Sequence, residues 1–427
     1  MTSRLRVSDR FLYFVLLWCI FSFKVILVGW GDTGVRVDDL LILLASLVLF
    51  GRGDIFRIPR SSGVKAYLIF VVISFCSAVW NVWVGRVELL NSALFVIRLL
   101  QYLSFYYIGY ALVESGIQVW RGLRIYFWML CVLVPLQMVR LIPVASRFDA
   151  SRASGNTNGP YELASVAVFF LCYFGYRERK KLGAASALII LFLTASRITC
   201  VATLLSFAKR AIEASKSKLR MATAAVLVAS LLWGVGVWIS SMADADSDTG
   251  LASRLHSLLS GSVTAGEMWE VYAAVPTYRT ATDFADGAVN HWALGFGMQS
   301  GSDVSAMARI VRWLALIKST LSHFDSIVLG MGPAFAWVAV DGQYVRIFVE
   351  TGLLGLLAFF CFLKAVTKPQ ADPSGAFREY VLIVALSACF IDTFTSYKTM
   401  MLLWLWHGMN EFQARKGDDS SSLSHAS

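Results

Sequence analysis

Charged residues are scarce in this sequence. Only 15% of its 427 residues are Asp, Glu, Lys or Arg, whereas ordinary soluble domains contain about 25%. Hydrophobic residues make up 57% of the chain. This composition excludes a soluble globular domain, a disordered chain and a fibrous one, because none of them combines so much apolar surface with so little charge. It indicates a polytopic membrane protein with room for about ten to twelve spans of roughly 20 residues each.

Cysteines and histidines are also few, and neither is arranged for a metal. All seven cysteines fall inside apolar segments, at Cys19, Cys76, Cys131, Cys172, Cys200, Cys361 and Cys389. The external loops therefore lack the thiols needed for disulfides or for cysteine-based metal sites. The five histidines show no metal-type spacing such as His-x-x-x-His. We predict no metal site and no cofactor.

The apolar stretches predict an all-α fold with about twelve transmembrane helices. The expected spans lie near residues 11–29, 37–50, 64–84, 89–113, 119–141, 161–176, 182–194, 198–208, 221–241, 344–366, 379–394 and 399–412. They divide the chain into a transmembrane bundle at 1–241, a large outer loop at 242–343, C-terminal transmembrane helices at 344–412 and a disordered tail at 413–427. The first apolar run is too long for a signal peptide, so we expect a retained signal anchor.

The lysines and arginines predict which ends of the spans face the cytoplasm. With the N-terminus inside, the basic clusters near 52–65, 121–124 and 177–181 all fall on the cytoplasmic side. The cluster at 209–220 joins them only if two short helices turn at the outer face at Ser196-Arg197. The positive-inside rule favours that turn. We therefore expect both termini and the 413–427 tail in the cytoplasm.

The large outer loop is the expected location of function, and it contains two predicted amphipathic helices, at 251–260 and 304–319. The apolar stripe of the second consists of Val304, Met307, Ile310, Val311, Leu314 and Ile317. Arg309 and Arg312 share its opposite face. Such a helix would lie along the membrane surface, so membrane lipids are expected partners. The net charge of +10 is spread over short loops, and nucleic acid is not an expected partner.

Three outer elements place arginine beside small or turn-forming residues. Arg152 precedes a Gly/Asn-rich stretch that ends at Asn158-Gly159-Pro160, Arg197 follows Ser196, and Arg309 and Arg312 lie on the helix at 304–319. The first element is equally explained as a loop leading into a helix, and the third as an interfacial helix touching lipid headgroups. An arginine at the tip of two buried helices is costly unless it meets an anion or reaches solvent, which favours a functional role for Arg197.

A fourth element supplies a carboxylate. Gly330 and Gly332 precede Asp341, which stands just before the span containing Glu350-Thr-Gly352-Leu-Leu-Gly355. The glycines permit a close approach of two backbone segments. A carboxylate at the start of this span is placed to activate a hydroxyl as a general base, or else to cap the helix.

In this order and spacing, these elements resemble the superfamily of bacterial O-antigen polymerases and O-antigen ligases, over roughly residues 140 to 366. Its members show a Gly/Asn-rich loop entering a helix, a Ser-Arg turn between two short helices and a long periplasmic loop with an Arg-x-x-x-Trp helix. Here Arg309 and Trp313 match that helix, and Glu350 begins the matching Glu-x-Gly motif. The usual Asn-Pro-Asn is replaced by Asn158-Gly159-Pro160. Asp341-Gly342 stands where ligases place a histidine, which favours the polymerase branch.

The resemblance implies a GT-C-like helical enzyme of the bacterial inner membrane whose site faces the periplasm. Its expected donor and acceptor are glycans linked to undecaprenyl diphosphate, and the expected reaction is metal-independent, inverting glycosyl transfer that builds O-antigen or a related surface polysaccharide. A chain-length regulator protein is a further expected partner. The resemblance and the chemistry together predict that Arg152, Arg197, Arg309 and Arg312 bind the diphosphate, because guanidinium groups neutralise developing charge. Asp341 is the predicted general base.

Three alternatives stay open from the sequence. An O-antigen ligase would transfer the finished glycan to lipid A-core, so only the acceptor would differ. A transporter of the same lipid would perform no chemistry and would show two pseudo-symmetric halves. Another class of membrane glycosyltransferase would use a carboxylate of the first outer loop, where Asp32, Asp38 and Asp39 lie. Acidic residues before a helix more often cap it.

Overall fold

The computed structural model of the chain describes residues 6–23, 26–30, 33–143, 152–214, 265–287, 304–336, 340–368, 372 and 374–424. In these ranges the protein is helical apart from one β-hairpin, so the predicted helical class is confirmed with that exception. The predicted span at 221–241 and the predicted helix at 251–260 lie outside the described residues.

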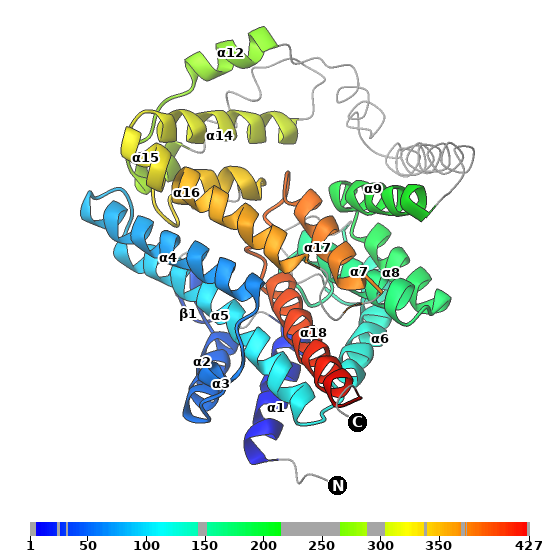
Figure 1. The fold of residues 1–427 in the computed structure, drawn as a ribbon. Coiled ribbons are helices and arrows are strands. Elements are labelled where there is room, and N and C mark those ends of the chain that lie inside the picture. The colour runs from blue at the N-terminus through cyan, green and yellow to red at the C-terminus, as the bar shows by residue number, and fades with distance from the viewer. Residues whose placement is uncertain are drawn as a thin grey trace.

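The elements run from α1 near the N-terminus to α18 near the C-terminus (Figure 1). In chain order they are α1 Val7–Phe21, β1 Ile26–Trp30, β2 Thr33–Arg36, α2 Val37–Gly51, α3 Asp54–Arg57, α4 Ser62–Trp83, α5 Leu89–Glu114, α6 Val119–Met138, α7 Pro160–Cys172, the π-helix η1 Tyr173–Arg177, α8 Lys181–Leu193, α9 Arg197–Ala214, α12 Ala265–Ala274, α14 Val304–Leu321, α15 Phe324–Leu329, α16 Gln343–Val366, α17 Ala376–Ser387 and α18 Tyr397–Ser424.

In the part of the chain that the structure describes, four helices are long and apolar enough to cross a membrane, namely α4, α5, α6 and α16. The predicted spans at 37–50, 182–194, 198–208 and 399–412 coincide with α2, α8, α9 and α18, and the span at 161–176 with α7 and η1. The predicted span at 379–394 is helical only as far as Ser387, the end of α17. Whether those helices also cross the membrane stays a prediction. The predicted turn at Ser196-Arg197 is present, because α8 ends at Leu193 and α9 begins at Arg197.

The first apolar run differs from its prediction. Helix α1 ends at Phe21, and β1 pairs antiparallel with β2, with Trp30 opposite Thr33. The predicted span at 11–29 is therefore wrong in its second half. Ile, Val and Trp favour strands, and a short apolar run does not by itself distinguish a strand from a helix. The hairpin leads directly into α2 and so fixes the position of Arg36 at the junction.

Helix α18 lies in the middle of the bundle, beside α5 (Figure 1). Its Trp404 is fully buried and packs on Tyr67 of α4, with 4.8 Å between the ring centroids. Its Trp406 packs on Phe169 of α7 at the same centroid distance. A side chain at Gly408 would overlap with the backbone carbonyl of Tyr106, so this glycine permits the close contact of α18 with α5. Small residues at such contacts are typical of membrane helix pairs.

The segment that contains α12, α14 and α15 lies at the opposite end of the bundle from the two termini (Figure 1). It has its own apolar core, to which Val275, Phe284 and Val311 contribute. An ion pair joins this segment to the end of α4, with 2.7 Å between Arg86 Nη1 and Asp325 Oδ2. The outer segment is therefore packed on the ends of the apolar helices.

Helix α14 occupies the predicted position, and its packed face overlaps the expected stripe in part, at Val311 and Leu314. Its buried residues include Val311, Ala315 and Leu316, together with Arg312, which is 6% exposed. The expected stripe residues Ile310 and Leu314 are only partly buried. The basic side of the helix also contacts the protein, because Arg309 pairs with Asp341 and Arg312 is buried.

The glycine motif brings two distant backbone segments into contact, as predicted. Gly352 interrupts α16 with a φ of 67°, and Met331 N donates to the carbonyl of Val349 at 2.7 Å. A side chain at Gly352 would overlap with the carbonyl of Val328, and one at Gly330 would overlap with the backbone at Glu350. This contact holds the outer segment against the first half of α16, where the site begins.

Candidate active site

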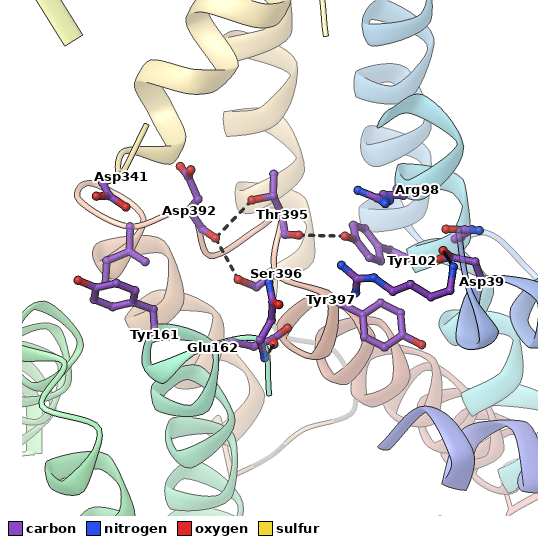
Figure 2. Close-up of a pocket in the computed structure, with 15 residues that line it drawn as sticks. Asp39, Arg98, Tyr102, Tyr161, Glu162, Asp341, Asp392, Thr395, Ser396 and Tyr397 are labelled. Carbon is purple, nitrogen blue, oxygen red and sulfur yellow. Dashed lines mark hydrogen bonds between the residues drawn. The ribbon is translucent and has the colours of Figure 1, made fainter. Parts of the chain in front are cut away.

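A polar cavity of about 230 Å³ lies between α2, α5, α7 and the segments that flank α16 and α17 (Figure 2). Its lining residues are Arg36, Asp39, Arg98, Gln101, Tyr102, Asn158, Gly159, Tyr161, Glu162, Asp341, Ile391, Asp392, Thr395, Ser396 and Tyr397. Figure 2 shows Asp341 and Tyr161 on one side and Arg98 and Asp39 on the other. Four carboxylates and two arginines among the lining residues make this a candidate site for charged or hydroxyl-bearing ligands.

Asp341 forms an ion pair with Arg309 of α14. Arg309 Nε donates to Asp341 Oδ2 at 2.9 Å, and both side chains are about three-quarters buried. Asp341 has a φ of 54°, a left-handed backbone conformation that aspartate tolerates better than most residues. The N-cap of α16 is Gly342 rather than Asp341. The carboxylate is therefore directed to Arg309 and the cavity, and the helix-cap explanation of Asp341 does not describe its contacts.

The two arginines of α14 differ in their surroundings. Burial disfavours the charge of Arg309, but attraction to Asp341 outweighs it, so the pKa of Arg309 lies above its ordinary value. Burial dominates at Arg312 and lowers the pKa of that guanidinium, with Asp341 and Asp392 as the nearby favourable charges. A buried guanidinium stabilises a nearby anion more than an exposed one does, because water screens it less.

Tyr161 connects the α14 arginines to Arg152. Its hydroxyl lies 3.5 Å from Arg309 Nη2 and 3.5 Å from Arg152 Nη1. The Arg152 guanidinium also lies over the Tyr161 ring, 4.7 Å from its centroid. Arg152 donates to the carbonyls of Thr194 and Ala195 in the turn between α8 and α9. The structure thus brings the first, second and third predicted elements together around one tyrosine.

The arginines predicted to bind the diphosphate do not line the cavity. Arg152 contacts Tyr161, and Arg309 contacts both Tyr161 and Asp341, but neither of them lines the cavity. Arg312 is also absent from the lining residues. Arg197 is exposed at the first residue of α9, two positions after a carbonyl that Arg152 holds. The arginines that do line the cavity are Arg36 and Arg98, and neither was among the predicted site residues.

Asp392 is a carboxylate that lines the cavity in addition to Asp341, and it was not among the predicted site residues. Its Oδ1 accepts from Gly342 N at 3.3 Å, and Arg346 Nη2 lies 2.9 Å from its Oδ2. Arg346 also lies 3.6 Å from Glu350, and its side chain is 12% exposed. Asp392 thereby fixes the residue after Asp341 and acts as a positioning residue. A signal was present, because a carboxylate inside a predicted span indicates function by default.

Glu162 is used to hold the loop that leads into α7. It accepts from the backbone nitrogens of Asn158 and Lys398, each at 2.7 Å. The Lys398 ammonium donates to the carbonyls of Ile20 and Asn156, both at 2.9 Å. Pro160 begins α7, as predicted for the first turn of a helix. This network ties α1, α7 and α18 together beneath the cavity floor.

Asp39 caps α2, as the sequence favoured. Its Oδ2 accepts from Arg36 N at 2.9 Å.

Within the described ranges, no group of three or more His, Cys, Asp and Glu residues is arranged to hold a metal ion. His323 is exposed at the N-cap of α15.

No protein-family model matches the chain, and no curated protein is significantly similar to it. The resemblance to O-antigen polymerases and ligases therefore depends on the motif residues themselves.

Proposed function

We propose that the protein polymerises oligosaccharide repeat units linked to undecaprenyl diphosphate, at the periplasmic face of a bacterial inner membrane. In this proposal the chain has about twelve spans, both termini are cytoplasmic, and α12, α14 and α15 belong to the periplasmic loop. The product is O-antigen or a related surface polysaccharide, and a chain-length regulator is a further partner. The apolar helices support the membrane location, since four of them are long enough to span.

One observation carries the proposal. A carboxylate, Asp341, lines a polar cavity, with the guanidinium of Arg309 at 2.9 Å. Glycosyl transfer from a diphosphate carrier needs these two functions together, a base for the attacking hydroxyl and cations for the leaving group. Metal-independent transfer requires that side chains supply the cations.

The acceptor hydroxyl loses its proton to Asp341 while its oxygen bonds to the anomeric carbon of the donor, with inversion. The bond from that carbon to the diphosphate oxygen breaks, and undecaprenyl diphosphate leaves with the electron pair. Arg309 and Arg312 stabilise this charge in a partly buried environment. Arg152 and the exposed Arg197 complete the proposed cationic group beside the α8–α9 turn.

Reconstitution with purified substrates tests the proposal. The full chain is placed in proteoliposomes with lipid-linked repeat units, and the products are separated by length. A ladder of lipid-linked oligomers supports polymerisation. Transfer only to lipid A-core indicates the ligase instead. Movement of the lipid across the bilayer without any new glycosidic bond indicates a transporter, and either of these results refutes the polymerase.

A further inference from the structure

The wall of the cavity opposite Asp341 is formed by a polar face of α5. Arg98, Gln101 and Tyr102 line the cavity at positions i, i+3 and i+4, which places them on one side of the helix. Helix α5 is otherwise apolar enough to cross a membrane. Arg98 lies nine residues after Leu89, about 14 Å along the helix axis. An arginine at that depth is costly unless it faces a polar cavity.

A second arginine reaches the same cavity from another element. Arg36 ends β2 and lines the cavity together with Asp39. The Asp39 carboxylate already accepts the backbone N–H of Arg36 as the cap of α2. The Tyr102 hydroxyl donates to the carbonyl of Thr395 at 3.0 Å. Two guanidinium groups from separate parts of the chain therefore line this cavity together with the carboxylates of Asp39 and Glu162.

The two sides of the cavity differ in how their carboxylates are paired. Asp341 pairs with Arg309, and Asp392 pairs with Arg346. Both of these arginines lie outside the lining residues, whereas Arg36 and Arg98 lie within them. Figure 2 shows Arg98 across the cavity from Asp341, with Thr395 between them. The cations that border the cavity directly are thus on the side away from the proposed base.

We infer that Arg36 and Arg98 form an anion subsite that binds a phosphate or diphosphate group. The planar guanidinium fork matches phosphate oxygens, and two forks that line one cavity from different elements favour an anion with several oxygens. The identity of the ligand as a lipid-linked glycan rests on the proposed function, but the anion site itself does not. Both the donor and the acceptor of a polymerase carry a diphosphate, so either is a source of this group.

A binding measurement tests the subsite without requiring catalysis. The full chain is placed in nanodiscs of phosphatidylcholine, and the Kd of undecaprenyl diphosphate without glycan is measured for wild type, Arg98→Gln, Arg36→Gln and Arg98→Lys. We expect both glutamine variants to bind about ten- to a hundredfold more weakly, with the lysine variant between them and wild type. Arg279→Gln is the matched control, because Arg279 is exposed in the same protein's outer segment.

The thermal midpoint of each variant separates lost binding from lost folding. Arg98→Lys and Arg36→Gln keep the inference testable if Arg98→Gln fails to fold. Folded variants that bind within about twofold of wild type would overturn the subsite. Inorganic pyrophosphate that competes with the lipid in wild type, and not in the glutamine variants, would support it.

Kinetics then distinguish the two sources of the phosphate. A higher KM for the acceptor alone assigns the subsite to the acceptor diphosphate, and a higher KM for the donor alone assigns it to the donor. Lost binding in a protein that makes no polymer would preserve the subsite while refuting the proposed function. Normal polymerisation kinetics in both glutamine variants would refute the subsite while preserving the function.

Discussion

Arg309 and Asp341 are 32 residues apart in the chain, yet the Arg309 Nε lies 2.9 Å from the Asp341 Oδ2. The pair joins α14 to the start of α16 and so holds the outer segment next to a residue that lines the cavity. It also gives Asp341 one oxygen that is fixed by a guanidinium, while the side chain lines the cavity. The contact therefore orients the proposed base and places a cation beside it.

Removing the Asp341 carboxylate should abolish turnover more than binding. We expect Asp341→Asn to lower the polymerisation rate by roughly 10²–10⁴-fold, the range typical of losing a general base. The Kd of the lipid-linked donor should change much less, because the amide keeps the shape of the side chain. Initial rates in proteoliposomes and a separate binding titration provide the two measurements.

Asp286→Asn is the matched control, since Asp286 is an exposed carboxylate of the same outer segment. Equal rates for Asp341→Asn and Asp286→Asn would show that Asp341 is not the base. Asp392→Asn would then be the next variant to measure, because its carboxylate also lines the cavity.

Much of the site was predictable because its motifs are local in sequence. The Ser196-Arg197 turn, the helix at 304–319 and the glycine contact at Gly352 each depend on short patterns that limit the backbone. Helix existence follows from apolar periodicity, and the position of a turn follows from the charges that flank it. These elements were found where the sequence placed them.

The missed features depend on contacts between distant residues. Asp392 meets the backbone of Gly342 from 50 positions away, and nothing local to either residue reveals the pairing. Arg98 was absorbed into an apolar span, although an arginine inside a span was itself a signal. The packed face of α14 was predicted only in part, because Val311 is buried as expected but Arg312, Ala315 and Leu316 are buried as well. An amphipathic pattern does not show which neighbour a helix will meet.

Lysine at position 309 or 312 of α14 should not support the activity that arginine supports there. Arg309→Lys keeps the charge but loses the planar contact with Asp341, and Arg312→Lys loses a buried guanidinium. We expect each to lower kcat/KM by about ten- to a thousandfold, the upper end being that of a lost oxyanion donor. Arg197→Lys should have a smaller effect, because Arg197 is exposed.

The control for these variants is Arg279→Lys. A change at Arg346, which is also an arginine close to Asp341 in the chain, would not serve as a control. Arg346 lies outside the sequence motifs, but it pairs with Asp392 and Glu350 and is nearly buried. Arg279 is exposed. Full activity in Arg309→Lys and Arg312→Lys would exclude them from the proposed stabilisation of the leaving group.

Acid should loosen the outer segment through Asp325. Hydrogen bonding to Arg86 lowers the pKa of Asp325 to about 2, although burial opposes this shift. A carboxyl whose folded pKa lies below its unfolded value of 3.8 stabilises the fold above that value. The contribution is lost as the pH falls from about 4 towards 2. The protection factors of the amides in α15, corrected for the intrinsic exchange rate at each pH, should therefore fall over this range.

Asp325→Asn separates this effect from general acid unfolding. The variant should show faster exchange in α15 at neutral pH and a weaker pH dependence below 4. An unchanged pH profile in Asp325→Asn would contradict the assignment to the Arg86 pair.

A methyl group at Gly352 should destabilise the protein. Gly352 has a positive φ, and its added Cβ would overlap with the Val328 carbonyl. Strain of this kind costs about 1–3 kcal/mol before the overlap is counted. We expect Gly352→Ala to unfold at a clearly lower temperature in detergent, whereas Gly51→Ala should not, because no atom lies within 4 Å of a Cβ at Gly51. Equal midpoints for the two variants would contradict the close backbone contact.

The orientation of the chain can be measured with two exposed positions. Glu270 lies in α12, at the end of the bundle opposite the termini, and Lys181 begins α8. Arg177, four residues earlier, donates to Asn410 and Gln413 of α18, so Lys181 lies at the same end as the C-terminus.

In a cysteine-free background, a membrane-impermeant maleimide should label Glu270→Cys in intact spheroplasts. It should label Lys181→Cys only after lysis, which also shows that this thiol is accessible. The positive-inside rule requires this result, because Lys181 belongs to a basic cluster and the outer segment faces the other side. Labelling of Lys181→Cys alone in intact cells would reverse the orientation and move the cavity to the cytoplasmic face. A periplasmic polymerase would then be impossible, since its glycan substrates would meet the wrong end of the bundle.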